Sequence, residues 1–333
     1  MNNITLLLLI SVLVSFLLSF LAIPYWIKRC KSIGLVWEDM NKFDKPKNVA
    51  SSGGIVVIMA FVLGVLSYVA LKTFVFDGTI RALEIFSLLS VILIFGIIGL
   101  VDDLLGWKNG GLSNRLRLLL AFIASVPLVV ISAGVHSINL PLLGSMDLGI
   151  LYPFVLIPLG VAGASTTFNF LAGFNGLEAG QGILVLSFLS FVSYSTGSPW
   201  LGIIGLCMVG ALLGFYLFNR FPAKVFPGDI MTYSIGALIA GMAILGNFEK
   251  IAIIVFIPYI IEVILKIRGR LEKHSFGIPT KMGGLKEPYG KIYGLEHLAI
   301  KILNRFGTAT EKKVTYLIHA FQILFILIAF CIM

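Results

Sequence analysis

Charged side chains are scarce in this chain. Only 12% of its 333 residues are Asp, Glu, Lys or Arg, whereas 58% are hydrophobic. A soluble globular protein needs a larger share of charged residues on its surface, so that class is excluded. Apolar runs of about 20 residues can cross a bilayer as helices. They predict an all-α polytopic membrane protein of about ten transmembrane helices, at residues 4–27, 50–71, 83–101, 117–135, 149–165, 180–196, 200–218, 229–246, 251–267 and 314–333.

Cysteines are also few. Cys30, Cys207 and Cys331 are scattered and lack the spacing of metal ligands, so they indicate no metal-binding motif. No long linker, low-complexity segment or soluble domain separates the apolar runs, and the only sizeable loop is 266–313. We therefore expect residues 1–333 to form a single integral membrane domain. A homodimeric assembly of this domain is one alternative.

The basic residues are unevenly distributed along the chain. No Lys or Arg precedes the first apolar run, whereas Lys28, Arg29 and Lys31 follow it at once. This pattern predicts an uncleaved helix with its N-terminus outside. If the ten spans then alternate, cytoplasmic loops hold 22 of the 25 basic residues and the C-terminus also lies outside. The net charge of +9 then reflects orientation in the cell membrane and contact with membrane lipids or phosphate, not nucleic acid.

Five polar clusters interrupt the apolar sequence, and all five fall on the cytoplasmic side of this topology. A transporter would more naturally place such groups near the bilayer midplane. The clusters instead favour cytoplasmic active-site loops acting on a substrate at the membrane surface, although a transporter of anionic lipid or nucleotide-sugar stays the alternative from another class. They are "FDKPKNVASSGG" (43–54), "GLVDDLLG" (99–106), "STTFNFLAGFNGLEAGQ" (165–181), "NRFPAKVFPGD" (219–229) and "RGRLEKHSFGIPTKMGG" (268–284).

The clusters combine hard oxygen ligands with cations and glycines. Carboxylate and amide oxygens suit Mg²⁺, with Mn²⁺ as an alternative, and glycines let backbone amides approach an anion. Together these groups predict binding of a diphosphate that carries a metal ion. The oxygen ligands are Asp102, Asp103, Asp229, Asn169 and Asn175, and the cations are Lys45, Lys47, Arg115, Arg117 and Lys224.

Asp102 and Asp103 are adjacent at the end of an apolar run. Successive residues on a helix point about 100° apart, so the two carboxylates cannot easily chelate one ion. We expect one carboxylate to face the reacting groups and the other to hold the surrounding groups in position. The alternative is that both simply cap the cytoplasmic end of the span as a solvated pair.

The three motifs "GLVDDLLG", "NFLAGFNGLEAGQ" and "PAKVFPGD", in this order, resemble the polyprenyl-phosphate N-acetylhexosamine-1-phosphate transferases. The segment "AGFNGLEAGQ" is closest to the dolichyl-phosphate branch of archaea and eukaryotes. The bacterial phospho-N-acetylmuramoyl-pentapeptide branch has a histidine run in its last loop, where this chain has only His274 and His297. A bacterial-type transferase that uses undecaprenyl phosphate stays the alternative within the enzyme class.

The resemblance implies transfer of N-acetylglucosamine-1-phosphate from UDP-N-acetylglucosamine to dolichyl phosphate, with release of UMP. This would be the first membrane step of lipid-linked glycan assembly, for protein N-glycosylation or cell-surface glycans. It implies that Asp229 and Asn169 bind Mg²⁺, Asn175 hydrogen-bonds uracil and Phe226 stacks on it. It implies catalytic roles for Asp102, Asp103, Arg117 and Lys45, of which Lys45 meets the lipid phosphate and Arg117 replaces a usual lysine. The further substrate-binding candidates are Lys224, Asn219, Lys273 and His274, the last two in place of an arginine pair.

Three features of the sequence leave the choice between function and packing open. Phe226 alone would be ordinary packing, and only its place beside "GD" makes it a candidate. Glu262 lies inside the ninth expected span, where a charge is a functional candidate, but an ion pair with Lys266 is an equal alternative. The apolar stripe Leu295, Leu298, Ala299, Ile302 and Leu303 predicts a helix in the cytoplasmic interface.

Overall fold

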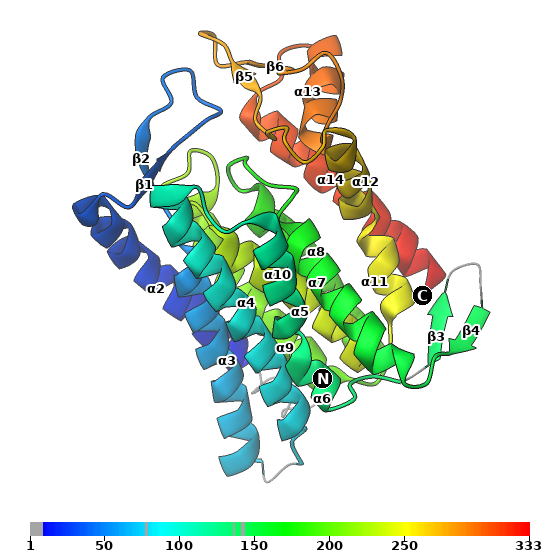
Figure 1. The fold of residues 1–333 in the computed structure, drawn as a ribbon. Helices are drawn as coiled ribbons and strands as arrows, with labels where there is room; N and C mark the ends of the chain where they lie inside the picture. The colour runs from blue at the N-terminus through cyan, green and yellow to red at the C-terminus, as the bar shows by residue number, and fades with distance from the viewer. Residues whose placement is uncertain (1–8, 77–78, 136, 141–143) are drawn as a thin grey trace.

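The protein is a bundle of helices with three short antiparallel hairpins (Figure 1). The structure, a computed structural model, describes residues 9–76, 79–135, 137–140 and 144–333. Within these ranges seven helices are long and apolar enough to cross a membrane, which confirms the all-α polytopic fold class. They are α2 (Ile10–Ile33), α3 (Gly54–Phe74), α4 (Ala82–Asn109), α8 (Leu177–Ser195), α9 (Pro199–Asn219), α10 (Asp229–Gly246) and α14 (Glu311–Ile332).

Each of the other three expected spans is formed by two shorter helical segments. Pro127, Pro158 and Pro258 are the second residues of the later segments in these spans, where a proline removes one backbone donor and its ring clashes with the preceding turn. The expected beginning of the first span, residues 4–8, lies outside the described residues. The broken spans are α5 (Asn114–Ala124) with α6 (Val126–Val130), the π-helix η1 (Tyr152–Leu156) with α7 (Ile157–Phe168), and α11 (Glu249–Val255) with α12 (Ile257–Arg268).

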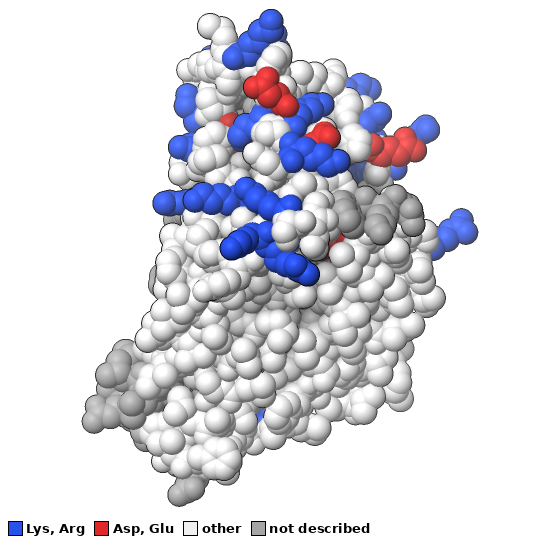
Figure 2. Space-filling view, turned by 90° about the vertical axis from the view of Figure 1, so that its left-hand side faces the viewer, with Lys and Arg blue, Asp and Glu red and all other residues white. Residues whose placement is uncertain are grey.

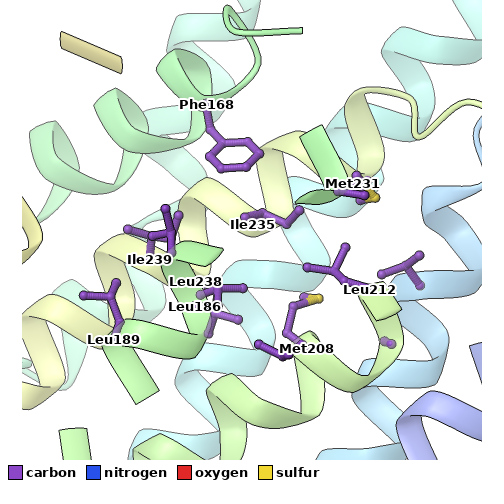
Figure 3. Packing of buried hydrophobic residues seen from close by; sticks show 14 of the residues in the cluster. Phe168, Leu186, Leu189, Met208, Leu212, Met231, Ile235, Leu238 and Ile239 are labelled. Atoms are coloured by element: carbon purple, nitrogen blue, oxygen red, sulfur yellow. The ribbon is translucent and has the colours of Figure 1, made fainter. Parts of the chain in front are cut away.

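Helix α10 forms the centre of the bundle and contacts α4, α7, α8, α9 and α3. Its side chains Met231, Ile235, Leu238 and Ile239 meet apolar side chains of α7, α8 and α9 (Figure 3). Close approach to α7 depends on Gly236, where a Cβ would collide with the backbone of Ala164. This close packing holds the first turn of α10, which begins at Asp229, in a fixed position.

Charged side chains gather at one end of the bundle, around β1, β2 and α13 (Figures 1 and 2). The hairpin β1–β2 (Val36–Glu38 and Lys47–Ala50) and the small hairpin β5–β6 (Ile278–Pro279 and Leu285–Lys286) lie at this charged end, while β3–β4 (Ser137–Leu140 and Gly144–Asp147) lies toward the other. The predicted amphipathic helix is present as α13 (Leu295–Arg305). Its buried side contacts α12 and α14, so part of the apolar stripe is covered by protein.

Candidate active site

A central cavity of about 770 Å³ opens at the charged end. Seven of the candidate catalytic, substrate-binding and metal residues line it, although they come from five separate segments of the chain. They are Asp102, Asp103, Arg117, Asn169, Phe226, Asp229 and His274. Its wall also includes carboxylates that the motifs had not singled out, namely Glu38, Asp39 and Glu178. The cavity therefore carries an excess of negative charge.

Asp102 and Arg117 form a two-point ion pair on one side of this cavity. The guanidinium Nε lies 2.5 Å from Oδ2 of Asp102, and Nη2 donates to Oδ1 at 2.9 Å. The backbone N–H of Leu112 also donates to Oδ1, at 2.8 Å. Gly111, with φ of +81°, lets the chain turn back against this carboxylate, where a Cβ would crowd both side chains. Asp102 is only 3% exposed, and its Oδ1 accepts two hydrogen bonds.

Asp103 accepts hydrogen bonds from the start of α10. Its Oδ1 accepts from the backbone N–H of Asp229 at 2.7 Å, and its Oδ2 accepts from Ile230 at 3.4 Å. These are the first amides of α10, whose own helix leaves them unpaired. Negative charge is favoured at this end of a helix. Asp103 therefore holds the start of α10 against the end of α4, and neither aspartate is a freely solvated cap.

Two glycine-containing loops from distant parts of the sequence are joined at the cavity floor. Phe226 donates its backbone N–H to Ala50 at 2.8 Å, Gly53 donates to Phe226 at 2.9 Å, and Gly54 donates to Pro227 at 2.8 Å. At Gly53 a Cβ would collide with the side chain of Val225. The backbone of Phe226 is thereby fixed from both sides while its ring lines the cavity.

Asn169 and Asp229 lie together at the centre of this wall. Asn169 follows the last turn of α7, and its Oδ1 accepts from the Thr232 hydroxyl at 2.9 Å. Thr232 stands one helical turn after Asp229 and lines the same cavity. Carboxylate and amide oxygens of this kind fit Mg²⁺. In the described part of the chain no group of three or more His, Cys, Asp or Glu could hold a metal ion.

The loop between α12 and α13 contributes His274 and Phe276 to the cavity. His297 Nδ1 accepts from the backbone N–H of Tyr293, so its Nε2 donates to the carbonyl of His274, at 3.0 Å. Burial lowers the pKa of His297 to about 4, which keeps the ring neutral and this arrangement intact. Lys273 lies outside the cavity lining, with its ammonium 5.3 Å from the ring centre of Tyr289.

Four other predicted residues do not line the central cavity. Lys45 is exposed on the β1–β2 connection, and Lys47 takes the lining position instead. Asn219 is buried, and its Nδ2 donates to the carbonyl of Val225 at 2.9 Å. Asn175 and Lys224 line a separate second cavity. The hydrogen bond expected between Asn175 and uracil stays a prediction.

Glu262 has a structural role on the final loop. It pairs with Lys266 at 3.4 Å, and its Oε2 accepts from the backbone N–H of Leu295 at 2.6 Å. Lys266 in turn donates to the Ser275 hydroxyl at 2.5 Å. Of the two alternatives for Glu262, the ion pair is therefore the one that the structure contains.

Sequence reasoning missed Thr232 and Glu178. Thr232 has a helical spacing from Asp229 that could have indicated it, since residues three apart share a face. Glu178 was visible within "FNGLEAG", and its Oε1 accepts from the backbone N–H of Gly173 at 2.8 Å. That contact shapes the loop between Asn169 and α8.

Comparison with known proteins assigns this arrangement to a family. Residues 85–247 match the family model described as glycosyl transferase family 4. A protein of Saccharolobus solfataricus, provisionally named UDP-N-acetylglucosamine--dolichyl-phosphate N-acetylglucosaminephosphotransferase, is 35% identical over 96% of this chain and 95% of its own length. A protein of Sulfolobus acidocaldarius with the same name is 33% identical, over 96% and 94%.

A more distant group of relatives has a different name. The phospho-N-acetylmuramoyl-pentapeptide-transferase of Streptococcus pyogenes serotype M6 is 34% identical over 76% of this chain and 77% of its own length. On similarity that covers nearly its whole length, the chain belongs to glycosyl transferase family 4.

Proposed function

We propose that this protein transfers N-acetylglucosamine-1-phosphate from UDP-N-acetylglucosamine to dolichyl phosphate and releases UMP. The observation that carries the proposal is the central cavity, where Asn169, Phe226 and Asp229 meet at the end of membrane-spanning helices. The names of the two archaeal relatives, which match over 96% of the chain, support the same donor and acceptor. The reaction would take place on the cytoplasmic side, where the basic loops are expected.

The reaction exchanges one phosphorus–oxygen bond for another. An oxygen of the lipid phosphate attacks the phosphorus that bears the sugar, and the bond between that phosphorus and UMP breaks. A phosphate monoester has its second pKa near 6, so the acceptor is mostly dianionic at neutral pH and needs no strong base. What opposes the reaction is repulsion between anions. The protein must therefore supply position and positive charge.

Arg117 supplies fixed positive charge within the chain itself. Its two-point pairing with Asp102 holds the guanidinium in one orientation at the cavity wall. Lys47 and His274 add groups from two other loops. Asp103 acts indirectly, because its hydrogen bond fixes the first turn of α10 and hence the position of Asp229. We assign neither aspartate of the pair the role of general base.

Mg²⁺ would be held by Asp229 and Asn169, with Thr232 orienting the amide oxygen of Asn169 through its hydroxyl. When bound, the ion neutralises charge on the diphosphate and on the departing UMP. The excess of carboxylates around the cavity favours a cation there, since Glu38, Asp39 and Glu178 line it as well. Phe226 would receive the uracil ring on a backbone that is already fixed.

The test uses purified protein in detergent with a panel of UDP-sugars, and with dolichyl and undecaprenyl phosphate as acceptors. We expect UMP release that requires Mg²⁺, with UDP-N-acetylglucosamine and dolichyl phosphate preferred and the lipid product identified by mass. Asp229→Ala and Asn169→Ala should each lose nearly all transfer but remain folded. Preference for undecaprenyl phosphate would favour the bacterial-type alternative. Transport of donor or lipid without UMP release would favour the transporter.

A further inference from the structure

A second cavity of about 410 Å³ lies beside the central cavity and shares no lining residue with it. It is formed by the last turn of α9, the loop that follows, and the first turns of α14. Its lining residues are Asn175, Tyr216, Leu217, Arg220, Phe221, Pro222, Lys224, Lys312, Thr315 and Tyr316. No carboxylate is among them, so this cavity differs in charge from the acidic central one.

The cations of the second cavity have no acidic partner in the part of the chain that is described. None of the ion pairs found there includes Arg220, Lys224 or Lys312. The nearby carboxylates of Asp39 and Glu311 are both paired with Lys42. The Lys312 ammonium instead lies 4.9 Å from the ring centre of Phe221. Asp39 and Glu311 both bond to Asn175 of the lining and share one lysine, so one negative charge remains beside the three cations, and the cavity keeps a net positive charge.

A buried hydroxyl at this cavity also lacks a hydrogen-bond partner. Thr315 is only 2% exposed, and its Oγ1 makes no hydrogen bond with any described residue. Leaving such a group unpaired in the interior is unfavourable. Asn175, 4% exposed, uses its Nδ2 to donate to Asp39 at 3.2 Å. Three cations and an unused hydroxyl donor together suit a ligand with several acceptor oxygens, which is the character of a phosphate group.

The position of the cavity indicates which kind of phosphate it meets. It lies where the apolar span α9 ends at Asn219 and the apolar span α14 begins at Glu311. Tyr216 and Tyr316 line it, and tyrosine is enriched at the boundary between bilayer and water. Basic groups at this depth attract anionic lipids of the cytoplasmic leaflet. We propose that the second cavity binds the phosphate headgroup of an anionic membrane phospholipid.

The experiment measures lipid retention by native mass spectrometry. Protein purified in neutral detergent is titrated with dioleoylphosphatidylglycerol or with dioleoylphosphatidylcholine. We expect one phosphatidylglycerol per chain to be retained more tightly than phosphatidylcholine. The double variant Arg220→Gln with Lys312→Gln should bind it about thirtyfold more weakly, since two interfacial cations are removed. Thr315→Val should weaken retention, and Thr315→Ser should restore it.

The matched control replaces two other exposed lysines of the charged end, Lys286→Gln with Lys301→Gln. This pair removes the same charge without touching the cavity and should leave retention unchanged. Equal weakening in both double variants would mean general surface attraction and would overturn the proposal, as would unchanged retention in the Arg220 and Lys312 variant. Displacement of the lipid by millimolar inorganic phosphate would overturn the lipid assignment in favour of a soluble phosphate. Unfolding temperatures confirm that the variants remain folded.

Discussion

Phe226 is the residue whose substitution best separates donor recognition from chemistry. Its ring lines the central cavity, while its backbone is held by Ala50 and Gly53. Stacking of a base on an aromatic ring is worth roughly 1 to 3 kcal/mol. If it acts equally in ground and transition states, its loss raises KM and leaves kcat nearly unchanged. Phe226→Ala should therefore raise KM for the UDP-sugar by about 10- to 100-fold.

Steady-state kinetics with each substrate varied in turn would check this expectation. KM for the lipid phosphate should hardly move. Phe43→Ala, an exposed phenylalanine of the β1–β2 connection, provides the control and should change neither constant. If Phe226→Ala instead raises KM for both substrates alike, the ring has a packing role and does not bind uracil.

Substitution of Thr232 tests the proposed metal site, because Thr232 contacts a proposed metal ligand without binding the metal itself. Its hydroxyl donates to Asn169 Oδ1 at 2.9 Å and thereby orients the amide. Loss of such a supporting hydrogen bond typically lowers metal affinity or activity by about 10- to 100-fold. Thr232→Val should therefore raise the Mg²⁺ concentration needed for half-maximal activity by that order, and Thr232→Ser should restore it. Titration of Mg²⁺ at saturating donor measures this directly. An unchanged requirement in Thr232→Val would remove Asn169 from the metal ligands.

The start of α10 depends on the loop before it. Gly228 has φ of +75° and lies against the Asp103 carboxylate, where a Cβ would collide. Gly110 has a similar φ of +85° but open space around it. Gly228→Ala should thus destabilise the protein by roughly 1 to 3 kcal/mol more than Gly110→Ala, since it adds a collision to backbone strain. It should also lower activity, because Asp229 shifts with the turn. Equal unfolding temperatures for the two variants would contradict this account of the α10 start.

His297 of α13 should make the free energy of unfolding depend on pH. Burial lowers its pKa from an ordinary 6.5 to about 4, and the charge of Lys266 acts in the same direction. The folded chain therefore binds this proton more weakly than the unfolded chain. Between about pH 6.5 and pH 4 unfolding takes up a proton, so the free energy of unfolding should fall as pH is lowered.

Thermal unfolding in detergent at several pH values measures this contribution. His297→Gln should flatten the slope between pH 6.5 and pH 4, whatever its effect at neutral pH. His274→Gln is the control, because His274 is exposed and interacts through its backbone. Identical slopes in the parent protein and His297→Gln would show that another group titrates.

The orientation of the whole molecule can be tested by labelling. Charged side chains gather at the end that carries the central cavity, and the cytoplasmic loops are expected to hold 22 of the 25 basic residues. In a background with the exposed Cys331 replaced by serine, Lys281→Cys should react with an impermeant reagent only from the cytoplasmic side. Thr79→Cys, in the connection between α3 and α4, should react only from outside. The reverse pattern would overturn the topology and the cytoplasmic source of the donor.

Much of the architecture could be predicted from the sequence because a bilayer imposes long apolar runs. A proline lies at the junction in three of those runs, at Pro127, Pro158 and Pro258, yet Pro24 lies within α2 without ending it. Proline alone therefore does not decide whether a span is continuous. The sequence pattern contains no information on the helices that pack against each span, so it could not show which prolines interrupt a helix.

The candidate site was predictable in its composition but not in its pairings. The motifs identified Asp102, Asp103 and Asp229, yet not that Asp102 would be held by Arg117 and Asp103 by the start of α10. Such partners depend on how distant segments meet. The choice of Lys47 over Lys45 depends on the register of the β1–β2 hairpin, which two closely spaced lysines could not reveal.

The pairing of the two loops at the cavity floor also bears on the entropy of donor binding. The amides of Gly53, Gly54 and Phe226 already donate hydrogen bonds to acceptors within the protein. These two loops are therefore ordered before a ligand binds. These amides should exchange slowly with deuterium even in the free enzyme. A nucleotide that binds here loses its own freedom but does not have to immobilise the surface beneath its base, and more of the contact energy remains as affinity.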